Sequence, residues 1–318
     1  MKRSLLAALL LVCFALPAFA DSPRASMKMQ PMTQISEYEA ALADIKTTLG
    51  FVPGFLKNYP QAALPGAWQV FKNVQMNNQS AIPVRYKELL GLAVASEIPC
   101  RYCTFFHTEA GRRNGASDAE RSEAIALAAL GKQRATIIES STQDEKSFRE
   151  ETDRVIEKLK ADKKLSDAPI MPASRMLSSP EEAYGDIELT LGLVPTFIRQ
   201  LQGEGVPGFW NQTRSLVLSS NTAIPAKYKD LILLGVSSQI PCTKCVYWDS
   251  EAARLNGASE AEIREAVSMA SIVTHWSTVL NGSQTNEAAF RKDVLQVLDH
   301  VKSVNEKARH ASNMPVNR

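Results

Sequence analysis

The sequence predicts an all-α protein built from two tandem copies of one helical domain. Shifting the chain by 142 residues aligns it with itself, without gaps, over more than eighty residues. Leu49-Gly50-x-Val52-Pro53 recurs as Leu191-Gly192-x-Val194-Pro195, and Ile82-Pro83-x-x-Tyr86-Lys87 recurs as Ile224-Pro225-x-x-Tyr228-Lys229. No segment shows the sustained apolar and polar alternation of a strand. Two copies are too few for a solenoid, so we interpret the chain as a tandem duplication.

Helix start and stop signals surround the centre of each copy. Pro83 is a suitable first helical residue, and apolar residues follow at helical spacing until Pro99 interrupts them. A second helix is expected from about Cys100 to Asn114, where Asn114-Gly115 supplies a left-handed stop. These signals place a helix on each side of the Ile98-Pro99 turn.

A third helix in each copy starts at a capping box. Ser117-Asp118-Ala119-Glu120 is repeated by Ser259-Glu260-Ala261-Glu262. Charged stretches at 144–160 and from about 287 to 307 are typical of amphipathic helices. We therefore divide the chain into a signal peptide (1–20), an extended N-terminal segment (21–37), domain 1 (38–162), a linker rich in Ser, Pro and Ala (163–180) and domain 2 (181–318).

The first twenty residues resemble a secretory signal. Met1-Lys2-Arg3 precedes an apolar run, and Ala18-Phe19-Ala20 fits the small-x-small rule for cleavage before Asp21. The apolar run is shorter than the roughly 20 residues that a membrane span needs. We expect a periplasmic or secreted protein with no membrane span.

The net charge and the absence of cofactor motifs exclude several classes of partner. The chain has 36 Lys and Arg against 34 Asp and Glu, and removal of Lys2 and Arg3 with the signal leaves the mature protein formally neutral. Neutrality argues against nucleic acid or an anionic membrane surface as a partner. No haem, flavin or nucleotide motif is present, so we expect no cofactor.

Four cysteines remain after the signal, all in two CxxC pairs: Cys100 with Cys103, and Cys242 with Cys245. An exported protein with no other cysteine has no separate disulfide framework. The pairs are therefore redox groups, structural disulfides or metal ligands. A metal site would use Cys-x2-Cys-x3-His, with zinc needing a fourth ligand.

The first pair is surrounded by groups that activate a thiol. Cys100, Cys103 and His107 lie at spacings of three and four, which places them on one helix face. Cys100 would lie in the first turn, where the helix dipole favours a thiolate. If the flanking helices form an antiparallel hairpin, Glu88 faces His107. We therefore hypothesise a proton relay from Glu88 through His107 to Cys103.

Glu88, eleven residues, Cys100-x-x-Cys103, three residues and His107 form a pattern that resembles the AhpD-like alkylhydroperoxidases of the carboxymuconolactone decarboxylase superfamily. The resemblance covers roughly 38–140 and 180–282. It implies an all-helical, usually oligomeric domain in which Cys103 attacks a peroxide, Cys100 resolves the sulfenic acid as a disulfide, and His107 with Glu88 relays protons. The superfamily's decarboxylases generally lack this CxxC, so decarboxylation is disfavoured.

The second copy departs from this pattern. It keeps Cys242 and Cys245 but has Asp230 at the position of Glu88 and Asp249 at that of His107. Two facing carboxylates repel, and neither is a good base unless burial raises its pKa. We expect this copy to be a disulfide relay or a structural disulfide.

The expected activity is that of an exported thiol-dependent peroxidase whose electrons come from an external thiol or a thioredoxin-like reductant. Two alternatives stay open: a thiol–disulfide oxidoreductase without peroxidase activity, and a metal-binding or structural oligomeric module. Met27, Met29 and Met32 would be the ligands of a copper site. The tandem could mimic a dimer of single-domain relatives, so we expect a homo-oligomer, such as a trimer of chains.

Overall fold

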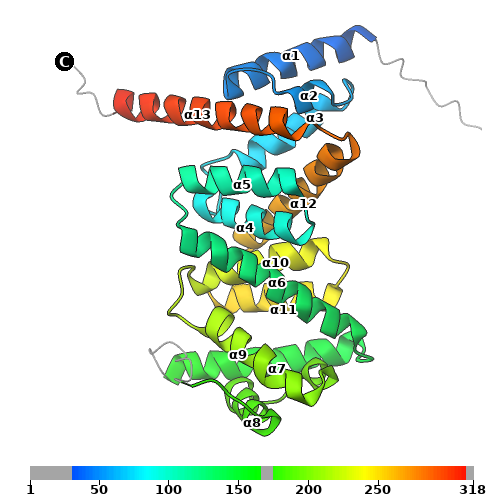
Figure 1. Cartoon of the computed structure of the whole chain (residues 1–318), viewed down its shortest axis with the longest axis vertical. Helices are drawn as coiled ribbons and strands as arrows, with labels where there is room; N and C mark the ends of the chain where they lie inside the picture. Colours follow the sequence, from blue (N-terminus) through cyan, green and yellow to red (C-terminus); the bar gives the residue numbers. More distant parts are fainter. Residues whose placement is uncertain (1–30, 166–174, 313–318) are drawn as a thin grey trace, which may run out of the picture.

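The computed structural model describes residues 31–165 and 175–312, and every regular element in these ranges is a helix (Figure 1). The first copy contributes α1 (Pro31–Leu49), α2 (Gly54–Lys57), α3 (Leu64–Val70), η1 (Phe71–Gln75), α4 (Val84–Glu97), α5 (Arg101–Arg113), α6 (Asp118–Ser140) and α7 (Glu145–Leu165). The second contributes α8 (Pro180–Leu191), η2 (Thr196–Gln200), η3 (Gly203–Gly205), α9 (Val206–Gln212), η4 (Thr213–Leu218), α10 (Ala226–Gln239), α11 (Thr243–Leu255), α12 (Glu260–Gly282) and α13 (Glu287–Ser312). The predicted all-α class is confirmed.

The predicted ends of the two helices around the Ile98-Pro99 turn, and the predicted starts of the capping-box helices, hold to within a residue or two. Ser117 and Ser259 each form a complete capping box with the glutamate three residues later. Gly115 has φ +85°, which is the left-handed stop expected after α5. Pro83 lies just before α4 with extended backbone, as its cap rather than its first residue. Such one-residue differences are usual at helix ends.

Two predicted irregular segments are partly helical. Helix α1 begins at Pro31, inside the segment 21–37 that was expected to be extended, because proline is well tolerated in a first helical turn. Helix α7 continues to Leu165, inside the predicted linker 163–180. Residues 1–30, which include the expected signal, lie outside the described residues.

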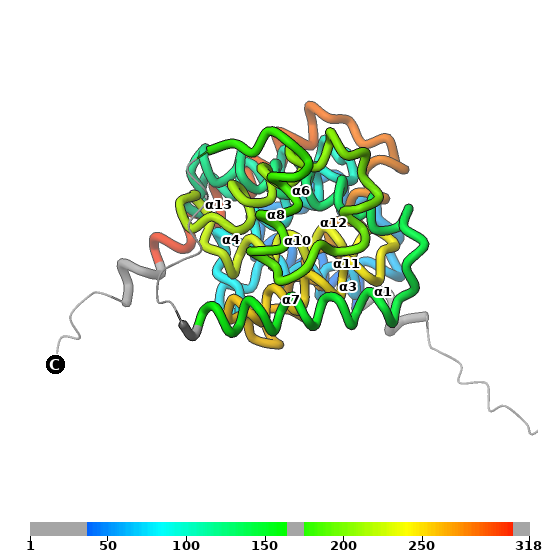
Figure 2. Tube along the Cα trace, turned by 90° about the horizontal axis from the view of Figure 1, so that it is seen from below, coloured from blue at the N-terminus to red at the C-terminus, as the bar shows by residue number. Residues whose placement is uncertain are grey.

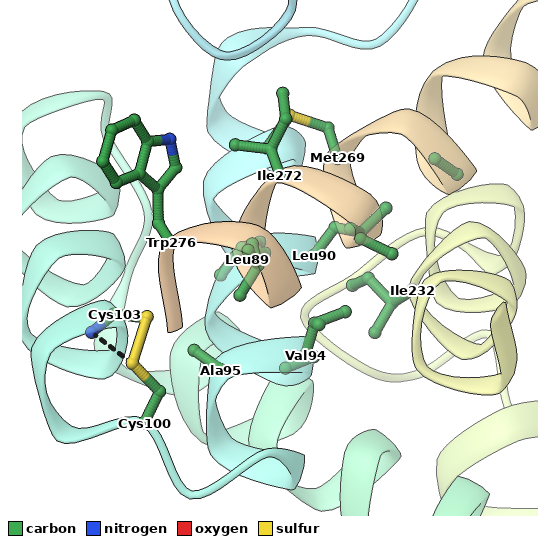
Figure 3. Close-up of a cluster of buried hydrophobic side chains, with 14 of the residues drawn as sticks. Leu89, Leu90, Val94, Ala95, Cys100, Cys103, Ile232, Met269, Ile272 and Trp276 are labelled. Atoms are coloured by element: carbon green, nitrogen blue, oxygen red, sulfur yellow. Dashed lines mark hydrogen bonds between the residues drawn. A yellow bond between two sulfur atoms is a disulfide. The ribbon is translucent and has the colours of Figure 1, made fainter. Parts of the chain in front are cut away.

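The core joins the two copies. Helices α4 and α6 of the first copy pack against α10 of the second, and α12 packs against α4. One apolar cluster accordingly runs through both halves, with Leu90 and Val94 of α4 near Ile232 of α10 and Met269 of α12 (Figure 3). Because burial of apolar surface is the main stabilising term, neither half has a complete core alone.

A carboxylate of the second copy is inserted into the first. Glu265 of α12 accepts the Ile82 N–H through Oε2 at 2.8 Å, and its Oε1 lies 3.4 Å from the Lys87 ammonium. Lys87 is buried and also donates to the carbonyl oxygens of Val74 and Asn77. Burial lowers the pKa of Lys87, and Glu265 opposes that decrease. The loop before α4 is thus held by a residue from the other copy.

The same contact recurs with the copies exchanged. Glu123 of α6 accepts the Ala223 N–H at 2.7 Å and lies 3.9 Å from buried Lys229. Between these two contacts Tyr86 and Tyr228 stack with 3.6 Å between ring centroids. Reciprocal contacts around a residue that meets its own equivalent define a local two-fold axis. The tandem therefore has the arrangement of a symmetric dimer within one chain.

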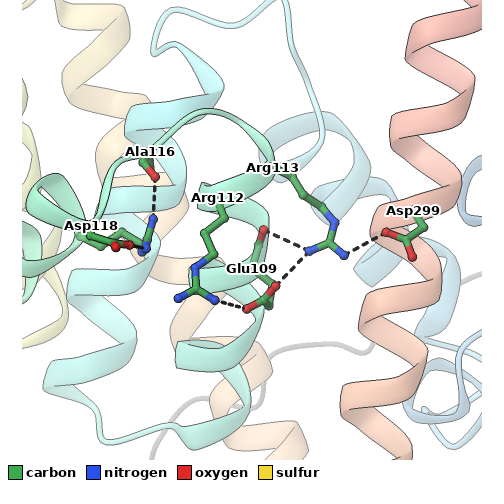
Figure 4. Close-up of polar contacts among 7 residues, drawn as sticks. Glu109, Arg112, Arg113, Ala116, Asp118 and Asp299 are labelled. Carbon is green, nitrogen blue, oxygen red and sulfur yellow. Dashed lines mark hydrogen bonds and ion pairs between the residues drawn. The ribbon is translucent and has the colours of Figure 1, made fainter.

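The long C-terminal helix of each copy covers the other copy. Helix α13 packs on α5, α1 and α2, and α7 packs on α11 and α8. Arg113 of α5 joins Glu109 to Asp299 of α13, with 2.9 Å to Asp299 (Figure 4). Figure 2, seen from below, shows α7 across the end of the molecule opposite α13 and α1. The boundaries predicted at 162 and 181 divide the sequence, whereas in space each copy is completed by the other's last helix.

We predict that Glu265→Ala lowers the free energy of unfolding by roughly 2–4 kcal/mol, because it leaves a buried ammonium short of its counter-charge and a buried N–H without an acceptor. Urea unfolding measures the change. The exposed Glu157→Ala is the matched control, with an expected change under about 0.5 kcal/mol. Equal effects of the two substitutions would contradict the role given to Glu265.

Candidate active site

The first cysteine pair lies where α5 begins. Cys100 is the N-cap, and its Sγ accepts the N–H of Cys103 at 3.2 Å (Figure 3). The two are joined as a disulfide, with Cα atoms 5.3 Å apart, and both are buried. Cys242 and Cys245 repeat the arrangement at the start of α11. In each pair the earlier cysteine therefore lies at the helix N-terminus, and its sulfur accepts a backbone N–H.

Glu88 and His107 meet as the hairpin hypothesis requires. His107 Nδ1 lies 2.8 Å from Glu88 Oε2, and both side chains are buried. A carboxylate only accepts hydrogen bonds, so the Nδ1 must carry the proton when Glu88 is ionised. His107 follows Cys103 by one turn of α5, which places both on one helix face.

Gln75 completes this pair, and no motif in the sequence predicted its role. It lies in the π-helical turn η1 that continues α3, and its Nε2 donates to Glu88 Oε1 at 2.7 Å. Each carboxylate oxygen of Glu88 therefore has a donor, one from an imidazole and one from an amide. Such a pair of donors fixes the carboxylate's orientation and, through it, the imidazole ring.

Gly91 makes room for the imidazole. A Cβ atom at this position of α4 would lie 2.3 Å from His107 Cε1 and 2.4 Å from Nδ1. Leu233 occupies the equivalent position in the second copy. An imidazole at position 249 would meet that side chain, which accounts for the smaller aspartate found there. Comparison of the two copies at Gly91 and Leu233 was the signal that could have revealed this.

A cavity of about 990 Å³ adjoins the site. Glu88, Phe106 and Asn114 of the first copy line it, and so do Trp276 of α12 and the apolar face of α13. The cysteines and His107 are buried outside this lining, with Cys103 only 5 % exposed. The second copy therefore supplies part of the wall beside the first copy's relay residues.

In the second copy the residues at the relay positions have different hydrogen-bond partners. Asp249 accepts two hydrogen bonds of 2.6 Å from Arg134 Nη2, and a third from the Ser237 hydroxyl. Arg134 comes from α6 of the first copy, at the position equivalent to Trp276. Burial raises the pKa of Asp249, while Arg134 and Ser237 oppose the rise. An ion pair thus stands where the first copy has an imidazole.

Asp230 has a hydrogen-bond partner of its own. Asn256 donates to its Oδ2 at 2.6 Å. Burial raises the pKa of Asp230 to about 7, and the charge of Asp249 adds to the rise. The repulsion expected between the two carboxylates is therefore present, and Arg134 relieves it.

Among the described residues no group of three or more His, Cys, Asp and Glu side chains could hold a metal ion. Met27, Met29 and Met32 lie outside these residues. Within the same ranges no helix is both long and apolar enough to cross a membrane.

The fold and the repeated site define a family. A model of the carboxymuconolactone decarboxylase family matches residues 62–133 and again residues 204–284. The chain therefore belongs to the carboxymuconolactone decarboxylase family and carries its domain twice, which confirms the resemblance seen in the sequence.

A solved structure from Burkholderia xenovorans LB400, named as a gamma-carboxymuconolactone decarboxylase subunit, is similar in fold. It has a TM-score of 0.50 and 15 % sequence identity, and the match covers 80 % of this chain and 98 % of that one. At this identity the likeness shows the fold alone. No curated protein matches the chain.

We predict that Gly91→Ala displaces the His107 ring and lowers the free energy of unfolding by roughly 1–3 kcal/mol, because a Cβ has no space there. Thermal unfolding measures the loss, and the imidazole proton resonances of His107 report its displacement. Gly66→Ala is the control: its Cβ meets nothing within 4 Å in α3. An undisturbed His107 resonance in Gly91→Ala would contradict this packing.

Proposed function

We propose that the chain is a thiol-dependent peroxidase whose chemistry is carried by the first copy. The buried hydrogen bond between Glu88 and His107, one helical turn from Cys103, is the observation on which this proposal rests. A thiol that reacts at neutral pH needs a base within reach, and this imidazole is held for that role. The same family pattern that the sequence shows supports the assignment.

Glu88 determines which ring nitrogen of His107 carries the proton. With the Nδ1 proton held by Glu88, the Nε2 of His107 is free to accept the proton of Cys103. The resulting imidazolium lies against an ionised carboxylate, which stabilises it. His107 can then return that proton to the alkoxide that leaves when the peroxide bond breaks.

The reaction balances in three steps. The Cys103 thiolate attacks the terminal oxygen of a hydroperoxide; the O–O bond breaks, and Cys103 sulfenic acid and an alcohol form with the proton from His107. The Cys100 thiol then attacks the sulfenic sulfur, forming the disulfide of the structure and releasing water. An external dithiol must reduce that disulfide by thiol exchange.

The adjoining cavity favours an organic hydroperoxide as substrate. Its walls include Phe55, Phe71, Phe106 and Trp276, and its volume is within the usual range for small-molecule sites. An alkyl hydroperoxide would bury its apolar part there more favourably than hydrogen peroxide could.

The second copy is assigned a different role. Cys242 and Cys245 have the same helix cap, but no imidazole accompanies them and Asp249 is held by Arg134. The carboxylate one turn from Cys245 is already engaged by Arg134 and Ser237, so the Cys245 thiol has no free proton acceptor at that position. We assign this pair to stability or to electron relay.

We predict that the reduced protein reacts quickly with cumene hydroperoxide and that Cys103→Ser abolishes this reaction. Stopped-flow tryptophan fluorescence follows the oxidation. The matched control is Cys242→Ser/Cys245→Ser, which should keep most of the rate. His107→Asn should slow the reaction by roughly 10²–10⁴-fold, the usual contribution of a general base. A fast phase that survives Cys103→Ser and disappears in the Cys242/Cys245 variant would reverse the assignment.

One observation favours a second candidate, a thiol–disulfide oxidoreductase. Cys100, not Cys103, is the N-cap whose sulfur accepts a backbone N–H, and this position stabilises a thiolate that exchanges with disulfides. An open hollow lined by Pro99, Arg101 and Thr104 lies beside it. Alkylation against pH decides which thiol is activated: a lower pKa at Cys100 together with no peroxide reaction would support this candidate.

We also propose that the protein acts in the periplasm or outside the cell, supported by the signal-like residues 1–20. Expression with its native start should yield a mature chain that begins at Asp21, as measured by N-terminal sequencing of the exported fraction. Recovery of an uncleaved chain in the cytoplasm would reject this location.

A further inference from the structure

A second cavity, of about 320 Å³, lies in the other half at the position equivalent to the first. Its lining follows the repeat: Val155 and Leu159 of α7 occupy the places that Val297 and Val301 of α13 hold in the first cavity. Arg134 stands where Trp276 stands. The volume is within the range of small-ligand sites, and the walls again come from both copies.

Four charged groups line these mainly apolar walls: Arg134, Lys163, Asp230 and Asp249. Arg134 is only 9 % exposed; its Nη2 is engaged by Asp249, but its buried Nε has no hydrogen-bond partner among the described residues. A buried donor left without an acceptor costs roughly 1–3 kcal/mol. Because Arg134 lines the cavity, a ligand oxygen that reached this donor would recover that cost.

Asp230 presents the complementary group. In the first copy the two oxygens of Glu88 receive His107 and Gln75. The residue equivalent to Gln75 is Val217, which has no donor, so the one hydrogen bond that the described residues give Asp230 comes from Asn256. Asp230 lines the same cavity as Arg134 and keeps capacity for another donor.

We propose that this cavity binds a small, neutral, apolar molecule that carries one hydroxyl group. A hydroxyl is the simplest group that both accepts, here from Arg134 Nε, and donates, here to Asp230. The apolar remainder would contact walls that include Phe197, Phe209 and Trp248. A carboxylate ligand fits less well, because Arg134 and Lys163 already balance Asp230 and Asp249, and a further negative charge in this buried site would have no counter-charge.

The proposal fixes the sign of a pH dependence. Besides Asn256, the charged groups that act on Asp230 are Asp249 of α11, Arg134 of α6 and Lys163 of α7, with Lys229 next to it in α10. Burial raises the pKa of Asp230 to about 7. A ligand hydroxyl that donates to the carboxylate favours the ionised form and lowers this pKa in the complex. Binding is therefore tighter at pH 8 than at pH 6.

Calorimetric titration of the oxidised, full-length chain with octan-1-ol tests the proposal. The expected result is one site per chain, about tenfold weaker for 1-methoxyoctane, which keeps the acceptor oxygen but lacks the hydroxyl donor. Equal affinity for the alcohol and the ether, or tighter binding of octanoate than of octan-1-ol, would overturn the proposal. Peroxidase activity plays no part in this measurement, so its outcome is independent of the proposed function.

Two variants locate the site. Ala252→Phe fills this cavity and should abolish binding, whereas Ala110→Phe fills the equivalent place in the first cavity and should leave it intact. Asp230→Asn leaves the size of the cavity almost unchanged and should remove the difference in affinity between pH 6 and pH 8. Binding that survives Ala252→Phe but not Ala110→Phe, or a pH profile unchanged in Asp230→Asn, would reject the site. Thermal unfolding confirms that each variant is folded.

Discussion

The exchange of carboxylates across the local two-fold axis is the contact on which the rest of the structure depends. Glu265 and Glu123 each contact the other copy, where each accepts a backbone N–H from the loop and lies beside the buried lysine. Removing a buried lysine from water is costly, and only a well-placed carboxylate with further acceptors compensates for it. The two helix pairs α4 with α12 and α10 with α6 can therefore pack in one register only.

This register also decides what each site contains. Because α12 lies against α4, Trp276 forms part of the first cavity's wall; because α6 lies against α10, Arg134 reaches Asp249. The same position in the repeat thus delivers an apolar wall to one site and a cation to the other. The divergence of the two sites rests as much on this exchanged residue as on the residues next to the cysteines.

Much of this could be read from the sequence. The 142-residue repeat and its capping boxes gave the helices, and the equal distances of Glu88 and His107 from the Ile98-Pro99 turn predicted their meeting. A hairpin is local, so its pairing follows from counting residues. The partner of Asp249 could not be found this way, since Arg134 lies 115 residues earlier in the chain and reaches it only through packing of the copies. The space that the imidazole occupies beside Gly91 is a matter of packing too, and only the difference between Gly91 and Leu233 in the repeat could have indicated it.

The crossing of α7 and α13 has a consequence for how such a chain can evolve. A gene duplication normally frees one copy to drift, but here each copy supplies a helix and a wall to its neighbour's site. Residues of α6 line the second cavity and not the first, so a substitution there alters the second site directly. Substitutions in the two halves are therefore coupled. The second copy could specialise only through substitutions that preserved the wall it supplies to the first site.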